Sequence, residues 1–486
     1  MEKSPAARSL TFVPSEAESE GKHITMSSSS DYRVVNPATG VEVATFSGLS
    51  DLEVVHAIER SSSTYGHWRR SDVGDRQRLL RNIAASFRNQ RTELAAIATL
   101  EMGKPIVQAE GEVDLCAAIF QYYADNAEDL LADEEVKTAG LEGVVQRSAL
   151  GVLLGVMPWN FPYYQIARFV APNILIGNTI LLKPARQCPE SALAFQRVVE
   201  DSGAPVGLFE TLLCSSQQIA TIVIPHEAVQ GVSLTGSENA GRAVARTAGD
   251  NLKKVVLELG GSDAFIVLDS SDLDTVVKLG ARARQGNSGQ SCVSAKRFIV
   301  VDEIYDEFVS LLASEFDRLQ PGDPTSPDTF LGPLGSADAL ADISQQVEAA
   351  VAEGAEVLTG GSRLPRPGFY FKPTILAGVT GQMAVYAEEL FGPVAVVYRV
   401  PDESGAIQLA NDSPFGLGAA VFSADESRAR RVADMLDVGM VSVNTISGTA
   451  PDLPFGGVKR SGFGRELGRY GMDEFVNKKL LRIARA

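Results

Sequence analysis

The order of apolar and polar positions divides the chain into helix-rich and strand-rich stretches. From Asp51 to about Leu131, apolar residues such as Val54, Val55 and Ile58 recur at helical spacing on otherwise charged segments. From Leu150 to Ile224, short apolar runs alternate with helical segments instead. The runs expected to be strands there are Val152–Met157, Thr179–Leu182, Glu210–Leu213 and Ile222–Ile224.

A second set of alternating runs follows the first. Its expected strands are Val255–Leu257, Ala264–Leu268, Phe298–Val301 and Val394–Val400. Strands that alternate with helices are joined by crossover connections, which place them parallel in one sheet. The pattern therefore predicts two α/β domains.

The N-terminal region differs from the rest of the chain. Residues 1–30 are rich in Ser and Glu and contain no apolar stretch like that of a secretory signal, so we expect a disordered tail. The ordered part is expected to begin near Tyr32, with a strand that ends in a turn at Gly40 and a second strand over Val41–Phe46.

Composition excludes several classes of partner. A formal net charge of -17 over 486 residues opposes binding to nucleic acid or to an anionic membrane. The longest apolar stretches, Ala149–Met157 and Ile174–Leu182, are too short or too interrupted to span a bilayer. Four cysteines without CxxC spacing indicate a reducing compartment, which predicts a cytoplasmic protein. Four scattered histidines form no ligand cluster, so no metal is expected.

One cysteine lies in a setting that suits a nucleophile. Gly286–Cys292 is a small, Gly-rich loop that leads into an apolar run, and such a loop lets backbone N–H groups approach a substrate oxygen. A thiolate attacks aldehydes readily, and the thiohemiacetal that forms can lose hydride. Taken alone, the thiol could equally be a buried small apolar group.

One carboxylate lies within an apolar strand. Glu258 follows Val255–Leu257 and precedes paired glycines, where burial would raise its pKa into the range useful for a general base. The alternative is a solvated carboxylate that pairs with Lys253 or Lys254 at the strand rim.

Seven motifs in order resemble those of the aldehyde dehydrogenase superfamily. The resemblance runs from about Tyr32 to the end of the chain, and the motif sequences are similar to those of the bacterial succinate-semialdehyde dehydrogenase branch. They are Met157–Pro162, Lys183–Ala185, Thr235–Ser237, Leu257–Gly261, Gly289–Cys292, Glu389–Pro393 and Pro454–Lys459. The resemblance implies two doubly wound domains, a Rossmann-like cofactor domain and a catalytic domain, with a small oligomerisation hairpin.

The resemblance also implies catalytic roles. Cys292 would attack the aldehyde, and the Asn160 amide would join the Cys292 backbone N–H in holding the oxyanion. Glu258 would activate the water that releases the acid from a thioester. No Ser/His/Asp constellation is needed.

The same resemblance implies a nicotinamide cofactor. Thr235–Ser237 opens a helix whose N-terminus suits a pyrophosphate, although a Ser there is also a common helix cap. The residues expected to contact the cofactor are Trp159, Asn160, Lys183, Pro184, Ala185, Arg186, Gly236, Ser237, Leu259, Glu389 and Phe391.

Arg186 decides which nicotinamide we expect. Many NAD-preferring relatives carry a Glu at this place, where it binds the adenosine ribose and repels a 2′-phosphate. Arg186 removes that repulsion and offers a guanidinium to the phosphate, which favours NADP over NAD. The alternative is that Arg186 points to solvent and pairs with Glu190.

The substrate prediction rests on Arg168. Relatives that oxidise succinate semialdehyde use an Arg at this place to hold the substrate carboxylate, although an Arg here could instead serve the structure. Two departures stand against this branch: Gly286 replaces a second Arg, and Ser294 replaces a cysteine that some relatives carry. The alternatives are a broad-range aldehyde dehydrogenase, a CoA-acylating enzyme, or a non-catalytic structural member of the family.

The resemblance divides the chain into parts. Residues 31–135 and 150–256 would form the dinucleotide-binding domain, and residues 257–471 the catalytic domain. Residues 136–149 and 472–486 would form oligomerisation segments of a homodimer or homotetramer. The strand expected over Glu474–Leu481 would be unpaired in a monomer.

Overall fold

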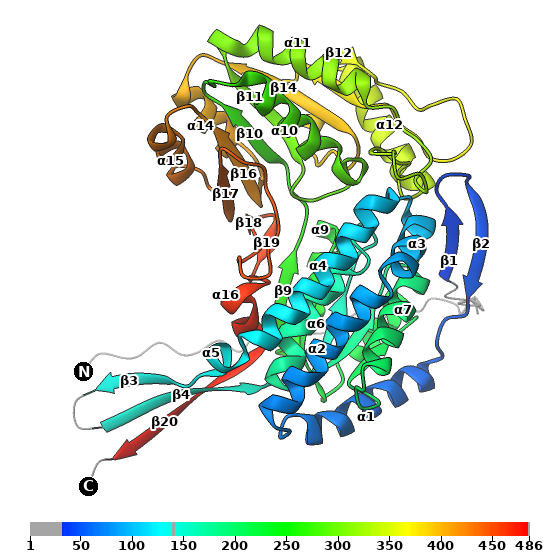
Figure 1. The fold of residues 1–486 in the computed structure, drawn as a ribbon, viewed down its shortest axis with the longest axis vertical. Helices are drawn as coiled ribbons and strands as arrows, with labels where there is room; N and C mark the ends of the chain where they lie inside the picture. The colour runs from blue at the N-terminus through cyan, green and yellow to red at the C-terminus, as the bar shows by residue number, and fades with distance from the viewer. Residues whose placement is uncertain (1–31, 139–140, 485–486) are drawn as a thin grey trace, which may run out of the picture.

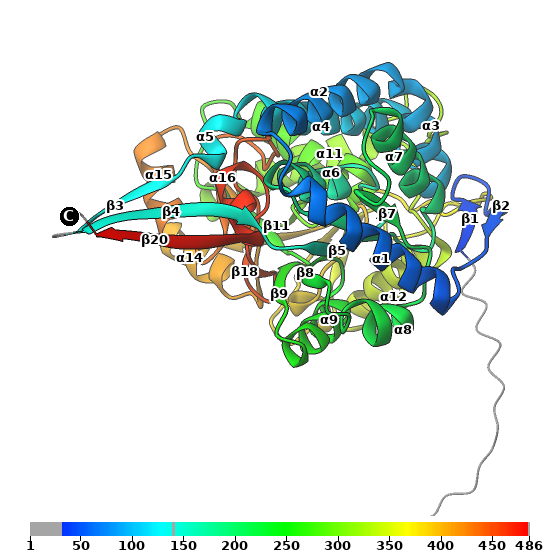
Figure 2. The same cartoon turned by 90° about the horizontal axis from the view of Figure 1, so that it is seen from below.

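The computed structural model describes residues 32–138 and 141–484, and the tail predicted at residues 1–30 lies outside them. The chain forms two lobes and an arm (Figure 1). The lower lobe in that view holds the first helices and the first large sheet, and the upper lobe holds the second. The arm projects from the lower lobe, which Figure 2 shows from below.

The first sheet has the strand order β7-β6-β5-β8-β9, with a short antiparallel strand at its edge. Its strands are β5 (Val152–Val156), β6 (Thr179–Lys183), β7 (Phe209–Thr211), β8 (Val229–Thr235), β9 (Lys254–Glu258) and β19 (Gly462–Phe463). β5 to β9 are parallel. The order reverses between β5 and β8, and ligands bind at such a switch point in doubly wound sheets.

Helices cover both faces of this sheet because successive strand residues point to opposite sides. Leu153 of β5 packs with α2, α4, α6 and α7, whereas Val152 and Leu154 pack with α1 and α9. Val54 and Ile58, predicted on the apolar face of a helix, are fully buried in the second group. The helices of this lobe are α1 (Asp51–Trp68), α2 (Val73–Asn89), α3 (Arg91–Met102), α4 (Ile106–Asp125), α5 (Ala127–Leu131), α6 (Tyr164–Ile176), α7 (Pro189–Asp201), α8 (Ser216–Gln218), α9 (Glu238–Asp250) and α16 (Gly468–Met472).

The second sheet has the order β12-β13-β14-β11-β10-β16-β17, and only β12 is antiparallel to its neighbour. Its strands are β10 (Asp263–Val267), β11 (Ala295–Val301), β12 (Glu356–Thr359), β13 (Thr374–Ala377), β14 (Val394–Val400), β16 (Gly418–Phe422) and β17 (Met440–Val443). Phe265 and Val267 pack on one face, and Ala264 and Ile266 on the other. The covering helices are α10 (Leu273–Gln285), α11 (Asp302–Arg318), α12 (Ala337–Ala352), α13 (Ala384–Ala387), α14 (Glu403–Asn411) and α15 (Glu426–Asp434). The predicted α/β class with two doubly wound domains is therefore confirmed.

The remaining strands form small sheets. β1 (Tyr32–Asn36) and β2 (Val41–Phe46) pair as the hairpin predicted near the start of the ordered chain, and β15 (Phe415–Gly416) pairs with β18 (Val458–Lys459). The arm consists of β3 (Glu134–Thr138), β4 (Leu141–Ala149) and β20 (Val476–Ala484), in the order β20-β4-β3.

Two predictions about the chain were wrong. The C-terminal strand is not unpaired in the single chain, because β20 pairs with β4 from Val476↔Ala149 to Ala484↔Leu141. Ile222–Ile224 is not a strand: a Ser215–Gln218 capping box starts a helix that continues as a π-helix over Ile219–Val223. Within the segment 257–471, β19 joins the first sheet beside β9.

The structure also bears on membrane association. Among residues 32–138 and 141–484, no helix combines the length and apolar content needed to cross a bilayer.

Candidate active site

The loop that carries Cys292 connects α10 to β11 and enters a strained turn. Asn287 and Ser288 have φ values of 52° and 55°, and Gly289 has a φ of 73°. A Cβ on Gly289 would lie 2.3 Å from the carbonyl oxygen of Gly392, so a side chain cannot be accommodated there. The Gly-rich sequence thus brings this loop against the segment that follows Glu389.

Arg284 ties these two segments together. Its buried guanidinium donates hydrogen bonds to the carbonyl oxygens of Gly289 at 3.2 Å, Leu390 at 2.7 Å and Val394 at 2.6 Å, and also to that of Gly392. Burial lowers the pKa of Arg284 to about 9. The sequence analysis did not identify this residue, because an Arg late in a helix usually faces solvent.

Cys292 lies where two cavities meet. The first, of about 330 Å³, is lined by Pro158, Trp159, Asn160, Gln165, Thr235, Gly236, Ser237, Glu258, Leu259, Gly260, Cys292, Asp342, Glu389 and Phe391. The second, of about 240 Å³, is lined by Gln108, Gly111, Glu112, Leu115, Phe161, Tyr164, Gln165, Ser291, Cys292, Val293, Thr449 and Phe455. The thiol can therefore meet one ligand from each side.

Burial sets the resting state of the thiol. It raises the pKa of Cys292 to about 12, and the positive charges of Lys296 and Arg168 oppose that rise. A group that accepts the thiol proton, or a change in the surrounding charges, is therefore needed before Cys292 becomes a thiolate.

Asn160 lies in the cavity wall shared with Cys292. It is buried, lines the first cavity beside Cys292, and donates from Nδ2 to the carbonyl oxygen of Gln290 at 3.0 Å. Asn287 in turn donates to the carbonyl oxygen of Asn160 at 2.8 Å, which fixes the turn. An amide nitrogen carries two hydrogens, so Asn160 keeps one donor for a substrate oxygen. Trp159 packs edge-on against Phe391, with ring centroids 5.8 Å apart.

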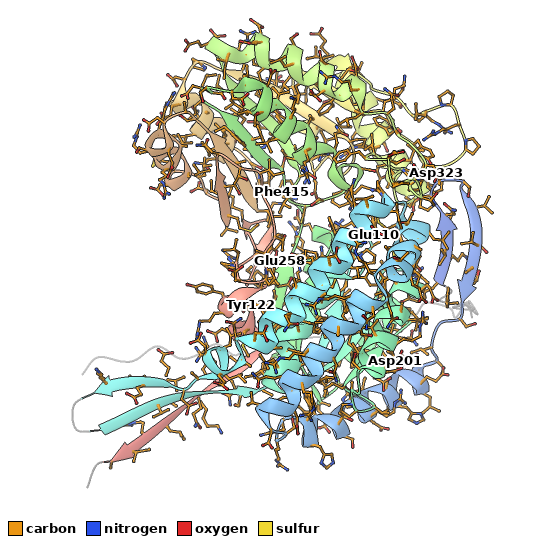
Figure 3. The ribbon with its side chains drawn as sticks, viewed as in Figure 1. Glu110, Tyr122, Asp201, Glu258, Asp323 and Phe415 are labelled. Atoms are coloured by element: carbon orange, nitrogen blue, oxygen red, sulfur yellow. The ribbon has the colours of Figure 1, made fainter. Side chains whose placement is uncertain are left out.

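Glu258 ends β9 at the junction of the lobes, as Figure 3 shows. Its side chain is buried, with the residue only 2% exposed, and neither carboxylate oxygen has a hydrogen-bond partner among the described residues. Burial raises its pKa well above the ordinary value, Arg168 opposes the rise, and Glu466 adds to it. An unpaired carboxylate with a raised pKa that lines the cavity of a nucleophile suits a general base. The solvated pairing with Lys253 or Lys254 is thereby excluded.

Arg168 is held in a different way from the one that the resemblance implied. Its buried guanidinium forms an ion pair with Glu466 and donates to Thr235 Oγ1 at 2.9 Å and to the Tyr164 hydroxyl at 3.4 Å. It also lies over the Phe455 ring, 4.7 Å from its centroid. Neither cavity at Cys292 counts Arg168 among its described lining residues. This arrangement favours the structural alternative.

Several of the predicted cofactor residues lie at the carboxyl ends of β6 and β8. Ser237 is the N-cap of α9, and the Gly236 N–H donates to the Glu258 carbonyl at 3.0 Å. Lys183 is buried at the end of β6, where it donates to the Pro184 carbonyl at 2.9 Å, and burial lowers its pKa. Only one of its three donors is used by the described residues, so it retains capacity for ribose hydroxyls or phosphate.

Arg186 follows at the exposed end of this region. The expected alternative, a pair with Glu190, is not formed, because Glu190 binds Arg197 at 2.6 Å instead. Arg186 therefore remains available to a phosphate group beside Lys183. Together with the cap of α9 and the adjoining cavity, these groups fit a dinucleotide that carries a phosphate at its adenosine end.

Glu389 lines the first cavity from the second lobe. Its Oε1 accepts from the Gly261 N–H at 3.0 Å and pairs with Lys296 Nζ at the same distance. Lys296 was not identified from the sequence, although an ionisable residue in a buried strand is a recognisable signal. Leu259 is buried in the same wall, and its N–H donates to the Ser461 carbonyl at 3.0 Å.

Comparison with known proteins gives a consistent result. Residues 24–481 match the model of the aldehyde dehydrogenase family. The chain is 51% identical to the succinate-semialdehyde dehydrogenase (NADP+) of Deinococcus radiodurans, covering 93% of this chain and 94% of that protein. It is 45% identical to succinate-semialdehyde dehydrogenase (NADP+) 1 of Mycobacterium tuberculosis, covering 93% and 99%.

Solved structures agree with these relatives. The crystal structure of succinic semialdehyde dehydrogenase from Streptococcus pyogenes in complex with NADP+ superposes with a TM-score of 0.92 at 43% identity, covering 93% of this chain and 100% of that one. Succinate-semialdehyde dehydrogenase from Burkholderia pseudomallei superposes with a TM-score of 0.90 at 36% identity, covering 94% and 95%.

Proposed function

This chain belongs to the aldehyde dehydrogenase family, and we propose that it oxidises succinate semialdehyde or a similar semialdehyde to the carboxylic acid with NADP+. The observation that carries the reaction class is Cys292 at the meeting point of two cavities, with Glu258 and Asn160 in the wall of one. The relatives named above support the substrate and the cofactor.

The chain's own residues account for the covalent steps. After the Cys292 thiol has lost its proton to solvent, its sulfur attacks the aldehyde carbon, and the free hydrogen of the Asn160 amide stabilises the oxygen that becomes negatively charged. When bound, the nicotinamide cofactor supplies the hydride acceptor. The acyl group then remains on Cys292 as a thioester, and Glu258 takes a proton from the water that attacks it.

Binding of the cofactor is assigned to both lobes. Trp159, Lys183 and the N-terminus of α9 come from the first lobe, and Glu389 and Phe391 from the second. Arg186 is proposed to bind the 2′-phosphate, because its side chain is exposed and Glu190 forms its ion pair with Arg197 instead. NADP+ is therefore proposed to be preferred over NAD+.

A broad-range aldehyde dehydrogenase remains the second candidate, and the second cavity favours it. Its lining includes Leu115, Phe161, Val293 and Phe455, but no Lys or Arg among the described residues. With Arg168 neutralised by Glu466, a substrate carboxylate would lack a direct cationic partner there.

An aldehyde panel separates these candidates. Succinate semialdehyde is compared with butanal, an uncharged aldehyde of equal chain length, using NADP+ or NAD+ without CoA. We expect kcat/KM to favour succinate semialdehyde by at least about tenfold, the effect of one charge-assisted contact. Equal values would support the broad-range enzyme. No turnover without CoA would support the acylating enzyme if CoA restores it, and the non-catalytic protein if it does not.

We also propose that the chain forms a homodimer or homotetramer through its arm. Leu480 and Ile483 on β20 are 54% and 49% exposed, and both β20 and β3 are edge strands. An apolar, open edge is stabilised by pairing with another chain. Sedimentation showing only a 51.8 kDa species would contradict this.

All four cysteines are free thiols within the described chain, which supports a reducing, cytoplasmic compartment.

A further inference from the structure

Lys296 connects the nucleophile loop to the cofactor cavity. It is the second residue of β11, is only 1% exposed, and its ammonium group has three N–H donors. Three oxygens receive them: the carbonyl of Ser291 at 2.8 Å, the carbonyl of Cys292 at 2.7 Å and Oε1 of Glu389 at 3.0 Å. The donors are therefore fully used, and two of the three acceptors belong to the nucleophile and its neighbour.

Glu389 is the only one of these acceptors that is a side chain facing the cofactor cavity. Its carboxylate pairs with Lys296 and also accepts from the Gly261 N–H, while Glu389 itself lines the cavity. A Cβ on Gly260 would lie 2.4 Å from Oε2 of Glu389, so the carboxylate can occupy this position only because residue 260 has no side chain. A ligand that hydrogen-bonds Glu389 therefore alters the surroundings of the ammonium.

The neighbouring Arg297 shows what a purely structural cation looks like in this strand. It donates to the carbonyl oxygens of Ser262, Leu409 and Ala410, none of which belongs to the nucleophile loop. Lys296 instead acts on the loop of Cys292 itself. The two adjacent cations therefore differ in their acceptors: Arg297 binds carbonyls outside the nucleophile loop, and Lys296 binds carbonyls within it.

Charged groups surround the thiol: Glu258, Asp342 and Glu389 line the first cavity with it, and Glu112 lines the second. Burial raises the pKa of Cys292 most, Lys296 and Arg168 oppose that rise, and Glu389 and the buried Asp263, which accepts from the Gly418 N–H, add to it. Arg168 is already neutralised by Glu466. Lys296 is therefore the cation whose effect on Cys292 depends on a group that the cofactor can reach.

We propose that Lys296 is a positioning residue that couples cofactor binding to the nucleophile. In the free protein, Glu389 partly neutralises the ammonium while it holds the Ser291 and Cys292 carbonyls. When ribose hydroxyls of the cofactor engage Glu389, more of the positive charge acts on the thiol, and thiolate forms at lower pH. The inference deepens the proposed function and rests on its assignment of Glu389 to the cofactor.

Alkylation of Cys292 by iodoacetamide tests this without turnover. The rate is measured against pH for wild type, Lys296→Met and Lys296→Arg, with Lys278→Met as a control for the same change at an exposed site of α10. Each is measured alone and with 2′-phospho-ADP-ribose, which carries the second ribose but lacks the nicotinamide ring that would cover the thiol. Peptide mapping assigns the label to Cys292.

Distinct results are expected for each variant. Lys296→Met should raise the midpoint by about one pH unit, which slows alkylation about tenfold below it. The ribose compound should speed wild-type alkylation about threefold at fixed pH and leave Lys296→Met unchanged. Lys296→Arg should keep the wild-type midpoint but lose the response, because a planar guanidinium cannot direct three donors from one atom. Lys278→Met should match wild type.

An unchanged midpoint in Lys296→Met, or a full ribose response in Lys296→Arg, would overturn the proposal. If Lys296→Met does not fold, Lys296→Arg alone decides it. If wild type oxidises aldehydes but these midpoints do not move, only the coupling is wrong. If wild type oxidises no aldehyde, the proposed function fails, and the midpoints without ligand still test the link between Lys296 and Cys292.

Discussion

The two ends of the cofactor region are built in opposite ways. At the nucleophile end, residues from both lobes meet, and buried cations such as Arg284 and Lys296 hold the loop through backbone carbonyls. At the adenosine end, Lys183 and Arg186 come from one lobe, and Arg186 is exposed. The nucleophile end is held by buried hydrogen bonds, and the adenosine end exposes the charge of Arg186 to solvent.

The difference teaches where large and small effects should occur. Charges and hydrogen bonds that are buried act strongly and cannot be replaced by water. Exposed charges are screened, so they adjust ligand preference by modest amounts. Chemistry should therefore fail abruptly when the nucleophile end is altered, whereas cofactor choice should shift gradually when the adenosine end is altered.

The largest effect is expected at Cys292. Replacement by Ser should lower kcat at least about 10³-fold, because an alcohol at neutral pH is far less nucleophilic than a thiolate. Binding of NADP+, followed by fluorescence, should remain close to wild type. Cys116→Ser is the control, since this buried thiol of α4 lines neither cavity. Retained turnover in Cys292→Ser would refute the mechanism.

The next effect is expected at Glu258. Glu258→Gln should slow steady-state turnover by about 10²- to 10⁴-fold, while a single-turnover burst of NADPH survives. Because burial raises the pKa of Glu258, its basic form increases as pH rises. Turnover limited by deacylation should therefore increase with pH in wild type, and this dependence should be absent in the variant. A burst that is lost in proportion to turnover would place Glu258 before acylation instead.

A change in stability is expected from the buried pair beside the nucleophile. Arg168→Met should lower the free energy of unfolding by about 3–5 kcal/mol, because it leaves Glu466 buried without its partner. Urea unfolding measures this, and adding Glu466→Gln should recover part of the loss.

The same variant tests the substrate role of Arg168. A structural role predicts equal losses of kcat/KM for succinate semialdehyde and butanal. A loss confined to succinate semialdehyde would show that Arg168 binds the substrate carboxylate, contrary to the arrangement described above.

The smallest effect is expected at the adenosine end. Arg186→Glu should shift the ratio of specificity constants for NADP+ and NAD+ toward NAD+ by about 1–2 kcal/mol, the scale of one charge-assisted hydrogen bond. Arg197→Glu is a matched control, because Arg197 is also an exposed arginine in this region but binds Glu190. An unchanged ratio in Arg186→Glu would remove the residue from 2′-phosphate recognition.

Much of the architecture could be predicted because its signals are local. The alternation of apolar runs located β5, β6, β9, β10, β11 and β14 within a few residues, since a buried strand needs apolar residues along its own length. Gly289 could be expected in a close approach because only glycine tolerates it. The error at Ile222–Ile224 has the same origin: a short apolar run does not distinguish a strand from a buried helical turn.

The sequence by itself determined the α/β class, the family motifs and the candidates Cys292, Glu258 and Asn160, because each depends on residue type and short-range order. Only the tertiary structure decided what the buried charges do. Arg168 lies 298 positions from Glu466, and Lys296 lies 93 positions from Glu389 in sequence, so neither pairing leaves a local pattern. The same holds for β20, whose partner β4 lies more than 300 residues earlier. Burial makes such long-range partners decisive, because a charge or strand edge removed from water must be matched by whichever group the fold brings beside it.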